Sequence, residues 1–361
     1  MGHKRLALES GEDPVNSPIE YIIESINTIY SIKHKNGAIR RVNVNIAATT
    51  VEEYTMLRDA GIGTYILFQE TYNKKKYEKM HPSGPKSNYD YHTTAMDRAM
   101  DGGIDDVGLG VLYGLSGYKY DFVGILMHAE HLEAVKGVGP HTISVPRIRD
   151  AEDIDSTKFK NGVPDDIFQK IVAILRIAVP YTGMIISTRE SQTTREKILD
   201  IGVSQISGGS STSVGGYDER NIKLQKHLEN NAEHDVLKKQ ADISRNTSQF
   251  EISDSRTLDE VVNWLLELGF IPSFCTACYR EGRTGDRFMS LVKNGQIANC
   301  CLPNALITLK EYLMDYATPD TKAKGEKLLQ NELFTIPNEK VRKLATENIA
   351  QIENGERDFR F

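Results

Sequence analysis

Short apolar runs rich in β-branched residues alternate with longer amphipathic stretches over residues 1–216. Seven of the runs have the length and composition of buried strands: KRLALES, RVNVNIAA, GTYILFQE, DDVGLGVLYGL, HTISVPRI, TGMIISTRE and VSQISGG. The stretches between them, such as IEYIIESINTIYSIKHKNG and DIFQKIVAILRIAVP, have helical periodicity. This alternation predicts an α/β fold, in which a parallel sheet is connected by helices.

Four expected helix starts carry a serine or threonine followed three residues later by a glutamate. They begin at Ser17, Thr50, Thr193 and Thr257. Such a pair satisfies two backbone N–H groups at the first turn of a helix. We therefore expect a helix to begin directly after each of these four residues.

The strand count falls one short of a closed barrel. A barrel of eight strand–helix units needs about 250 residues, whereas seven candidate strands occupy residues 1–216. The sequence also opens on a strand, which would lie at an exposed edge if the sheet were open. We expect a TIM-type barrel that is open or lacks its first βα unit.

Composition changes after the predicted barrel. Residues 217–254 are polar, charged and poor in aromatic residues, which is typical of an exposed insertion or linker. Residues 255–361 then form a C-terminal module that we expect to be helical except around its cysteines. The sequence thus predicts a barrel, a linker and a smaller module.

Overall composition excludes several classes of protein. The 361 residues carry a formal net charge of −6 with a pI near 5.9, and 39% of them are hydrophobic. Lysine and arginine are dispersed, so no basic stripe indicates nucleic-acid binding. No window approaches the run of about 18 apolar residues that spans a membrane, and the N-terminus lacks a signal sequence. We expect a cytoplasmic protein.

All four cysteines lie within one 27-residue window, in the arrangement C-x2-C-x22-C with Cys300 directly before the last one. The three motif cysteines are Cys275, Cys278 and Cys301. A zinc site and a redox-active dithiol are alternatives, but structural zinc takes four ligands, and adjacent side chains rarely converge on one ion. Three thiolates and an open corner favour an iron–sulfur cluster with one exchangeable iron.

Polar residues follow the predicted strands, where a parallel barrel gathers its functional groups. Ser187 and Arg189 follow one strand and suit a carboxylate, since they offer a charged fork and a hydroxyl. Glu12, preceded by the flexible Gly11, could accept from a substrate ammonium group. The competing interpretation is that these acids and bases are solvated or stabilise helix ends.

A histidine pair, His128 and His131, lies late in a predicted helix, near the opposite face of the barrel. Its default interpretation is a surface pair. If the cysteine module packs against that face, a role as metal ligand becomes attractive.

Several segments resemble the radical S-adenosylmethionine (SAM) maturases of FeFe hydrogenase. They are MGHKRLALESGEDP, ETYNKKKYEKMHPSGPKSNYDYHTTAMDRAMDGGIDDVGLGVLYGL, HAEHLEAVKGVGPHTISVPRIR, STRES and CTACYREGRTGDRFM. The resemblance covers nearly the whole chain, and its barrel part is shared with the tyrosine lyase of thiamine synthesis. It implies a radical SAM barrel that binds SAM and a 4Fe-4S cluster. It also implies cleavage of L-tyrosine to p-cresol and dehydroglycine, which becomes CO and cyanide on the iron of a second, C-terminal 4Fe-4S cluster.

The resemblance also implies residue roles. Cys275, Cys278 and Cys301 match the ligands of the C-terminal cluster, and His131 matches the ligand of its labile iron. The segment Ser10, Gly11 and Glu12 matches the motif that holds the amino group of SAM, and Ser187 with Arg189 matches the pair that binds the tyrosine carboxylate. No catalytic residue is assigned, and other hydrogenase maturation proteins are the implied partners.

One family motif is missing from the sequence. The family binds its SAM cluster through C-x3-C-x2-C, whereas every cysteine here lies beyond residue 274. We therefore expect a chain shortened at its N-terminus, which cannot by itself bind the SAM cluster through cysteine. The alternatives are a 2-iminoacetate synthase of thiamine synthesis, a non-catalytic iron-binding remnant and, more distantly, an aldolase-type barrel, for which no strand-end lysine is evident.

Overall fold

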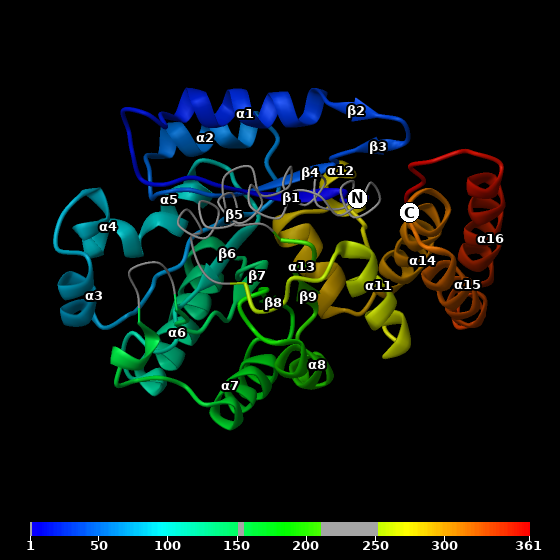
Figure 1. Cartoon of the computed structure of the whole chain (residues 1–361). Coiled ribbons are helices and arrows are strands. Elements are labelled where there is room, and N and C mark those ends of the chain that lie inside the picture. The colour runs from blue at the N-terminus through cyan, green and yellow to red at the C-terminus, as the bar shows by residue number, and fades with distance from the viewer. Residues whose placement is uncertain (1, 151–154, 211–251) are drawn as a thin grey trace, which may run out of the picture.

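The computed structural model describes residues 2–150, 155–210 and 252–361. Seven strands form one parallel sheet in the order β1-β4-β5-β6-β7-β8-β9 (Figure 1). Their bounds are Arg5–Glu9 (β1), Arg41–Asn45 (β4), Tyr65–Ile66 (β5), Val107–Gly110 (β6), Thr142–Ser144 (β7), Gly183–Ile186 (β8) and Gln205–Ile206 (β9). Each strand lies within one of the seven predicted runs, so the α/β prediction is confirmed.

The sheet is an incomplete barrel with β1 and β9 at its two ends. β1 pairs with β4 from Arg5↔Arg41 to Glu9↔Asn45, and β8 pairs with β9 at the other end. Neighbours in the sheet are also neighbours in the sequence of these seven strands, as in a βα barrel. The predicted edge position of β1 is therefore confirmed.

Helices cover the outside of the sheet and build the C-terminal module. The barrel helices are Ile19–Ser31 (α1), Val51–Asp59 (α2), Lys74–Met80 (α3), Tyr89–Thr93 (α4), Ala95–Asp101 (α5), Tyr118–Lys136 (α6), Asp165–Ala178 (α7) and Gln192–Ile201 (α8), with short 3-10 helices at Pro85–Ser87 and Ser156–Lys158. The module contains Leu258–Glu267 (α11), Ala277–Arg280 (α12), Gly285–Lys293 (α13), Ala298–Asp315 (α14), Pro319–Leu333 (α15) and Glu339–Glu353 (α16). None of the helices in the described ranges could cross a membrane, because none is both long and apolar enough.

Two of the four predicted helix starts are confirmed. Thr50 caps α2 by accepting from the Glu53 N–H, and Thr257 caps α11 in a complete capping box with Glu260. The start at Ser17 is wrong, because the extended Pro18 is the N-cap of α1. Thr193 is wrong as well, because Ser191 caps α8 from two residues earlier.

Two other predictions of helix extent need correction. The helical stretch predicted through Gly37 ends at Ser31, and Lys33–His34 (β2) pairs with Gly37–Ala38 (β3) in a hairpin. Lys35 and Asn36 form the turn, with Lys35 at a positive φ of 51°, and this turn overrides the weak helical pattern of the polar residues there. Around the cysteines the module is more helical than expected, because Cys278 lies in α12 and Cys300 and Cys301 lie in α14.

The helix α11 joins the barrel to the C-terminal module through two buried faces. Val261, Trp264 and Leu265 belong to the core between sheet and barrel helices. Val262 and Leu266 pack instead against Leu309, Tyr312 and Leu313 of α14. α14 in turn packs against α15 and α16, which stand beside the barrel in Figure 1. One helix thus belongs to two hydrophobic cores, which ties the two parts together.

The predicted linker, residues 217–254, lies outside the described residues except at its end. There the backbone N–H groups of Ser253 and Asp254 donate to the carbonyl of Thr188, directly after β8, at 2.9 and 3.1 Å. The Asp254 carboxylate forms ion pairs with Arg195, whose side chain is fully buried, and with Arg256 at 2.6 Å. This buried network connects the start of the C-terminal module to α8.

We predict that Asp254→Asn destabilises the chain by about 3 kcal/mol, because it leaves the Arg195 charge buried with a weaker partner. Urea unfolding followed by circular dichroism measures the change. The matched control is Glu347→Gln, which removes an exposed pair with Lys343 at 4.0 Å and should cost less than about 0.5 kcal/mol. Equal effects of the two substitutions would contradict the prediction.

Candidate active site and cluster site

The residues predicted to bind an amino-acid carboxylate lie at the carboxyl end of β8. The Arg189 N–H donates to the Ser187 hydroxyl oxygen at 3.3 Å, so the two residues form one compact turn. Both side chains are partly buried. Burial lowers the pKa of the Arg189 guanidinium, and the carboxylates of Glu70, Glu9 and Glu190 act in the opposite direction. Arg189 therefore lies within electrostatic reach of the ends of β1 and β5 as well as its own strand.

The segment predicted to hold SAM follows β1 at the same edge of the sheet. The Ser10 N–H donates to the Asn45 carbonyl at 3.3 Å, which extends the pairing of β1 with β4. A side chain at Gly11 would meet nothing within 4 Å, so the backbone is open to a ligand there. Burial raises the pKa of Tyr77, and Glu70 and Glu12 raise it further, which places Glu12 near the end of β5. The strand ends thus bring Glu12 and Arg189 to the same edge, as predicted.

A buried carboxylate next to Arg189 holds the neighbouring loop in place. Glu190 is 1% exposed and accepts from Arg147 Nε at 2.8 Å and from Arg149 Nη2 at 2.5 Å. Arg147 also donates to the Val163 carbonyl at 2.8 Å. The sequence analysis missed both arginines, although the segment SVPRIR, which begins at the end of β7, was a visible signal. This network fixes the ends of β7 and β8 relative to each other.

The loop after β5 is held from two sides. Asp121, fully buried in the first turn of α6, accepts from the Thr71 hydroxyl at 2.7 Å and the Tyr72 N–H at 2.9 Å. Glu70 has a positive φ of 64° and forms an ion pair with Lys86 at 2.7 Å. A positive φ is costly for a residue other than glycine, and such strain clusters at functional sites.

His92 supports the same strand end. Its Nε2 donates to the Phe68 carbonyl at 2.9 Å, and the residue is 3% exposed. Burial lowers the pKa of His92 to about 4, an effect that the bond to Phe68 opposes. The imidazole is therefore neutral when the protein is folded at neutral pH.

The cysteine module docks against the opposite edge, where the strands begin. The Thr284 hydroxyl donates to Asp105 at 2.7 Å, and the Gly285 N–H donates to the buried Asp106 at 3.2 Å; both aspartates lie just before β6. Lys293, at the end of α13, forms an ion pair with Glu133 of α6. The cysteine module therefore packs against the barrel face near which His128 and His131 were expected, which was the condition for a histidine to act as a metal ligand.

The strongest contact at this edge joins β4 to the cysteine motif. The Arg41 guanidinium stacks 3.5 Å from the ring centroid of Tyr279, the residue after Cys278, and donates to its hydroxyl. Arg41 also donates to the Thr64 hydroxyl at 2.5 Å, which lies 3.0 Å from the Tyr279 oxygen. These contacts fix the C-x2-C turn against the first residues of β4 and β5.

The four thiols influence one another strongly. Cys301 is exposed as a residue, but burial of its thiol raises the pKa to about 12, with smaller contributions from Cys278, Cys275 and Cys300. Burial raises the pKa of Cys278 too, as do Cys275 and Cys300. Side chains that shift one another's pKa in this way occupy one small region, so the thiols lie near one another, while their role as cluster ligands stays a prediction.

Positive charge surrounds these thiols. Burial and Arg41 lower the pKa of Arg5 to about 10, while the groups that favour its charged form are the Cys275 thiol and the Tyr279 phenol. Arg283 acts on the thiols from the other side. Partly buried guanidiniums facing thiols suit an anionic cluster carried on thiolates. In the described ranges no three His, Cys, Asp or Glu side chains come together tightly enough for a single metal ion.

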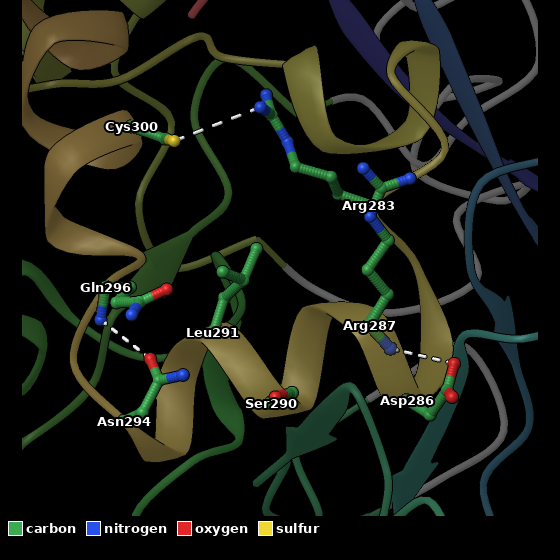
Figure 2. A pocket seen from close by; sticks show the side chains of 8 residues that line it. All are labelled: Arg283, Asp286, Arg287, Ser290, Leu291, Asn294, Gln296 and Cys300. Atoms are coloured by element: carbon green, nitrogen blue, oxygen red, sulfur yellow. Dashed lines mark hydrogen bonds between the residues drawn. The ribbon is translucent and has the colours of Figure 1, made fainter.

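A cavity of about 550 Å³ opens beside the thiols, between α13 and the start of α14. Figure 2 shows Cys300, Arg283 and Arg287 in its wall, with Asp286, Ser290, Leu291, Asn294 and Gln296 completing it. The Cys300 sulfur points toward the Arg283 guanidinium, 3.9 Å from Nη1. Of the four cysteines, Cys300 lines this cavity.

The two histidines expected at this end lie on α6. His131 is about half exposed, with Nε2 2.8 Å from Asp97 of α5. His128 is partly buried against Tyr72, whose hydroxyl lies 2.9 Å from its Nδ1. Glu133, two residues beyond His131, contacts the module, but the predicted role of His131 as an iron ligand stays a prediction. A histidine that the sequence analysis passed over, His141, has its ring in contact with Tyr279 and Phe288 of the module.

Comparison with solved structures places this fold in the class of radical SAM barrel enzymes. A crystal structure of HydG, described as a maturase of the [FeFe]-hydrogenase, is 57% identical and superposes with a TM-score of 0.91 over 100% of this chain and 74% of that one. HydG from Carboxydothermus hydrogenoformans is 38% identical, with a TM-score of 0.75 over 96% of this chain and 70% of that one. The chain belongs to the HydG maturase family.

Curated relatives at lower identity extend the family. The 2-iminoacetate synthase of Escherichia coli (strain K12) is 26% identical over 227 residues, and that of Salmonella typhimurium (strain LT2) is 24% identical over the same length. The aligned region makes up 63% of this chain and 58% of each relative. Residues 144–271 match the Biotin and Thiamin Synthesis associated domain. The resemblance stated from the sequence is therefore confirmed at the level of family and fold.

We predict that stability falls as the pH is lowered from about 6.5 towards 4, partly through His92. The unfolded histidine has a pKa near 6.5 and the folded one about 4, so the unfolded state binds more protons in this window. His92→Gln keeps an amide donor for the Phe68 carbonyl and should reduce the loss at pH 4.5 by about 2 kcal/mol. Urea unfolding at several pH values measures this, with the exposed His34→Gln as control. An unchanged pH dependence in His92→Gln would refute it.

Proposed function

We propose that the protein to which this sequence belongs is a carbon–carbon lyase of [FeFe]-hydrogenase maturation. It cleaves L-tyrosine to p-cresol and dehydroglycine and converts the latter to CO and cyanide. The observation that carries this proposal is the three-cysteine site docked under the barrel, at the edge opposite to the Ser187–Arg189 turn. One barrel thereby offers an amino-acid site at one end and a cluster site at the other.

At the carboxyl ends of the strands the proposed substrate is L-tyrosine. Arg189 and the Ser187 hydroxyl bind its carboxylate, because a guanidinium and a hydroxyl offer directed donors to the two oxygens. Ser10, Gly11 and Glu12 hold the amino group of SAM, with the Glu12 carboxylate as the charged acceptor. SAM with its own 4Fe-4S cluster would supply the 5′-deoxyadenosyl radical, and residues 1–361 contain no C-x3-C-x2-C motif to hold that cluster. The network around Glu190 keeps Arg189 oriented while the substrate is bound.

At the opposite edge, where the strands begin, Cys275, Cys278 and Cys301 hold the second cluster, and His131 binds its labile iron. The cluster supplies iron for CO and cyanide. Arg5, Arg41 and Arg283 stabilise the negative charge of cluster and thiolates. Other hydrogenase maturation proteins are the proposed partners, because the labile iron with its ligands has to leave the site.

A second candidate function is that of a 2-iminoacetate synthase, which the curated relatives carry as their name. Such an enzyme would use only the site at Ser187 and Arg189, and its reaction would end at dehydroglycine. The docked cysteine module favours the maturase, since a lyase that releases dehydroglycine has no need of a second iron site.

We predict that anaerobic reconstitution with iron and sulfide loads roughly four iron atoms per chain at the cysteine site. Cys278→Ala should load less than about a tenth of this amount, because two thiolates hold a cluster poorly. Iron and acid-labile sulfide analysis measures loading. The control is Ser290→Ala, an exposed change on α13 outside the thiol set. Equal iron loading of Cys278→Ala and the parent chain would refute the cluster assignment.

We predict that Arg189→Met weakens L-tyrosine binding about 10- to 100-fold, which corresponds to the loss of one charge-assisted interaction. Isothermal titration calorimetry measures the affinity. Tyramine, which lacks the carboxylate, should bind the variant and the parent chain with the same affinity. The control Arg58→Met, on the exposed face of α2, should change the affinity for neither tyrosine nor tyramine. An equal loss for tyrosine and tyramine would show that Arg189 acts on the fold and not on the carboxylate.

A further inference from the structure

The C-x2-C-x22-C motif uses three of the four thiols in this chain and leaves Cys300 without a role. Cys300 lies in the first turn of α14, directly before Cys301. It is partly buried, whereas Cys301 is exposed. Cys300 is thus a fourth thiol directly beside the motif, and its presence there calls for an explanation.

Arg283 holds Cys300 close to the C-x2-C turn. The Arg283 backbone N–H donates to the Cys278 carbonyl at 2.7 Å, and its Nη1 donates to the Cys300 sulfur at 3.9 Å. Its Nη2 donates to the Phe361 carbonyl, which also accepts from Asn304 Nδ2 at 3.3 Å. One arginine, fixed at both ends, therefore connects Cys278 to Cys300, as Figure 2 shows for the side-chain contact.

The adjacency of Cys300 and Cys301 argues against a shared single ion, but not against a shared cluster. Successive residues of an α-helix point about 100° apart, so their sulfur atoms cannot easily meet at one metal. A 4Fe-4S cluster has four separate irons, and each accepts one thiolate. Two adjacent cysteines can therefore bind two different corners of the same cluster.

We propose that Cys300 is a fourth, exchangeable thiolate ligand of the C-terminal cluster, positioned by Arg283 on the iron that the three motif cysteines leave open. This inference rests on the cluster assigned in the proposed function. Binding replaces a solvent ligand with the Cys300 sulfur and releases the thiol proton to water, without electron transfer. The bond protects the open iron until the labile iron arrives.

The cavity beside Cys300 makes the exchange possible. Cys300 forms part of its wall, together with Arg283 and Arg287. When the labile iron takes the fourth corner, the Cys300 side chain can turn into this space and keep its contact with a guanidinium. The exposed Cys301, held in the motif spacing, stays bound throughout.

Four chains test the proposal after anaerobic reconstitution with iron and sulfide: the parent, Cys300→Ser, Cys301→Ser and the double variant. If Cys300 is a ligand, Cys301→Ser still has three thiolates and should keep about half of its iron or more, whereas the double variant should fall about tenfold. The second readout is iron loss during mild oxidation with ferricyanide, followed by the paramagnetic signal of the three-iron product. Cys300→Ser should lose its fourth iron about tenfold faster than the parent chain.

Arg283→Gln tests the positioning role separately. Relative to the iron that it loads, this variant should lose the fourth iron faster on oxidation than the parent, while Arg283→Lys should restore part of the protection. The proposal is overturned if Cys301→Ser loads as little iron as the double variant, or if Cys300→Ser and the parent lose iron at the same rate. Failure of the parent chain to load iron would instead refute the proposed function.

Discussion

The contact of Arg41 with Tyr279 is the interaction on which the rest of this structure depends. A guanidinium at the start of β4 stacks on the ring that follows Cys278 and is also bonded to Thr64 at the start of β5. A partly buried cation–π contact is worth about 2 kcal/mol or more when it is desolvated. It therefore fixes the C-x2-C turn against the barrel, although more than 230 residues separate Arg41 from Tyr279. Loss of this contact would free the C-x2-C turn from the first residues of β4 and from Thr64.

Two further devices keep the module in register with the barrel. The helix α11 buries one face in the barrel core and the other against α14, so neither core is complete without it. The aspartates before β6 accept from Thr284 and Gly285, which sets the start of α13. Packing thus gives the attachment its strength, and these directed polar contacts give it its orientation. The orientation of the module in turn sets the positions of the cysteines in α12 and α14.

The two proposed sites impose opposite electrostatic demands on one barrel. At the carboxyl ends of the strands, Arg189 lies among several carboxylates, which suits a substrate that brings both charges with it. At the amino ends, Arg5 and Arg41 face thiols and a phenol, which suits an anion. A parallel sheet separates these environments naturally, because all of its strands end at one edge and begin at the other. The architecture therefore allows an amino acid and a metal cluster to be handled in the same chain.

The sequence by itself determined the strands and the class of fold, and it singled out the three cysteines of the candidate cluster site. Alternating apolar runs and a three-cysteine spacing are local signals, because strand burial and ligand type depend on residues close together in the chain. Ser187 and Arg189 were found in the same way, since both follow one strand. Only the tertiary structure decided which distant groups meet them: Arg147 and Arg149 on Glu190, Arg41 on Tyr279, and Arg283 on Cys300. These partners come from separate strands and loops, and no local pattern records a contact that exists only after the sheet has curled and the module has docked.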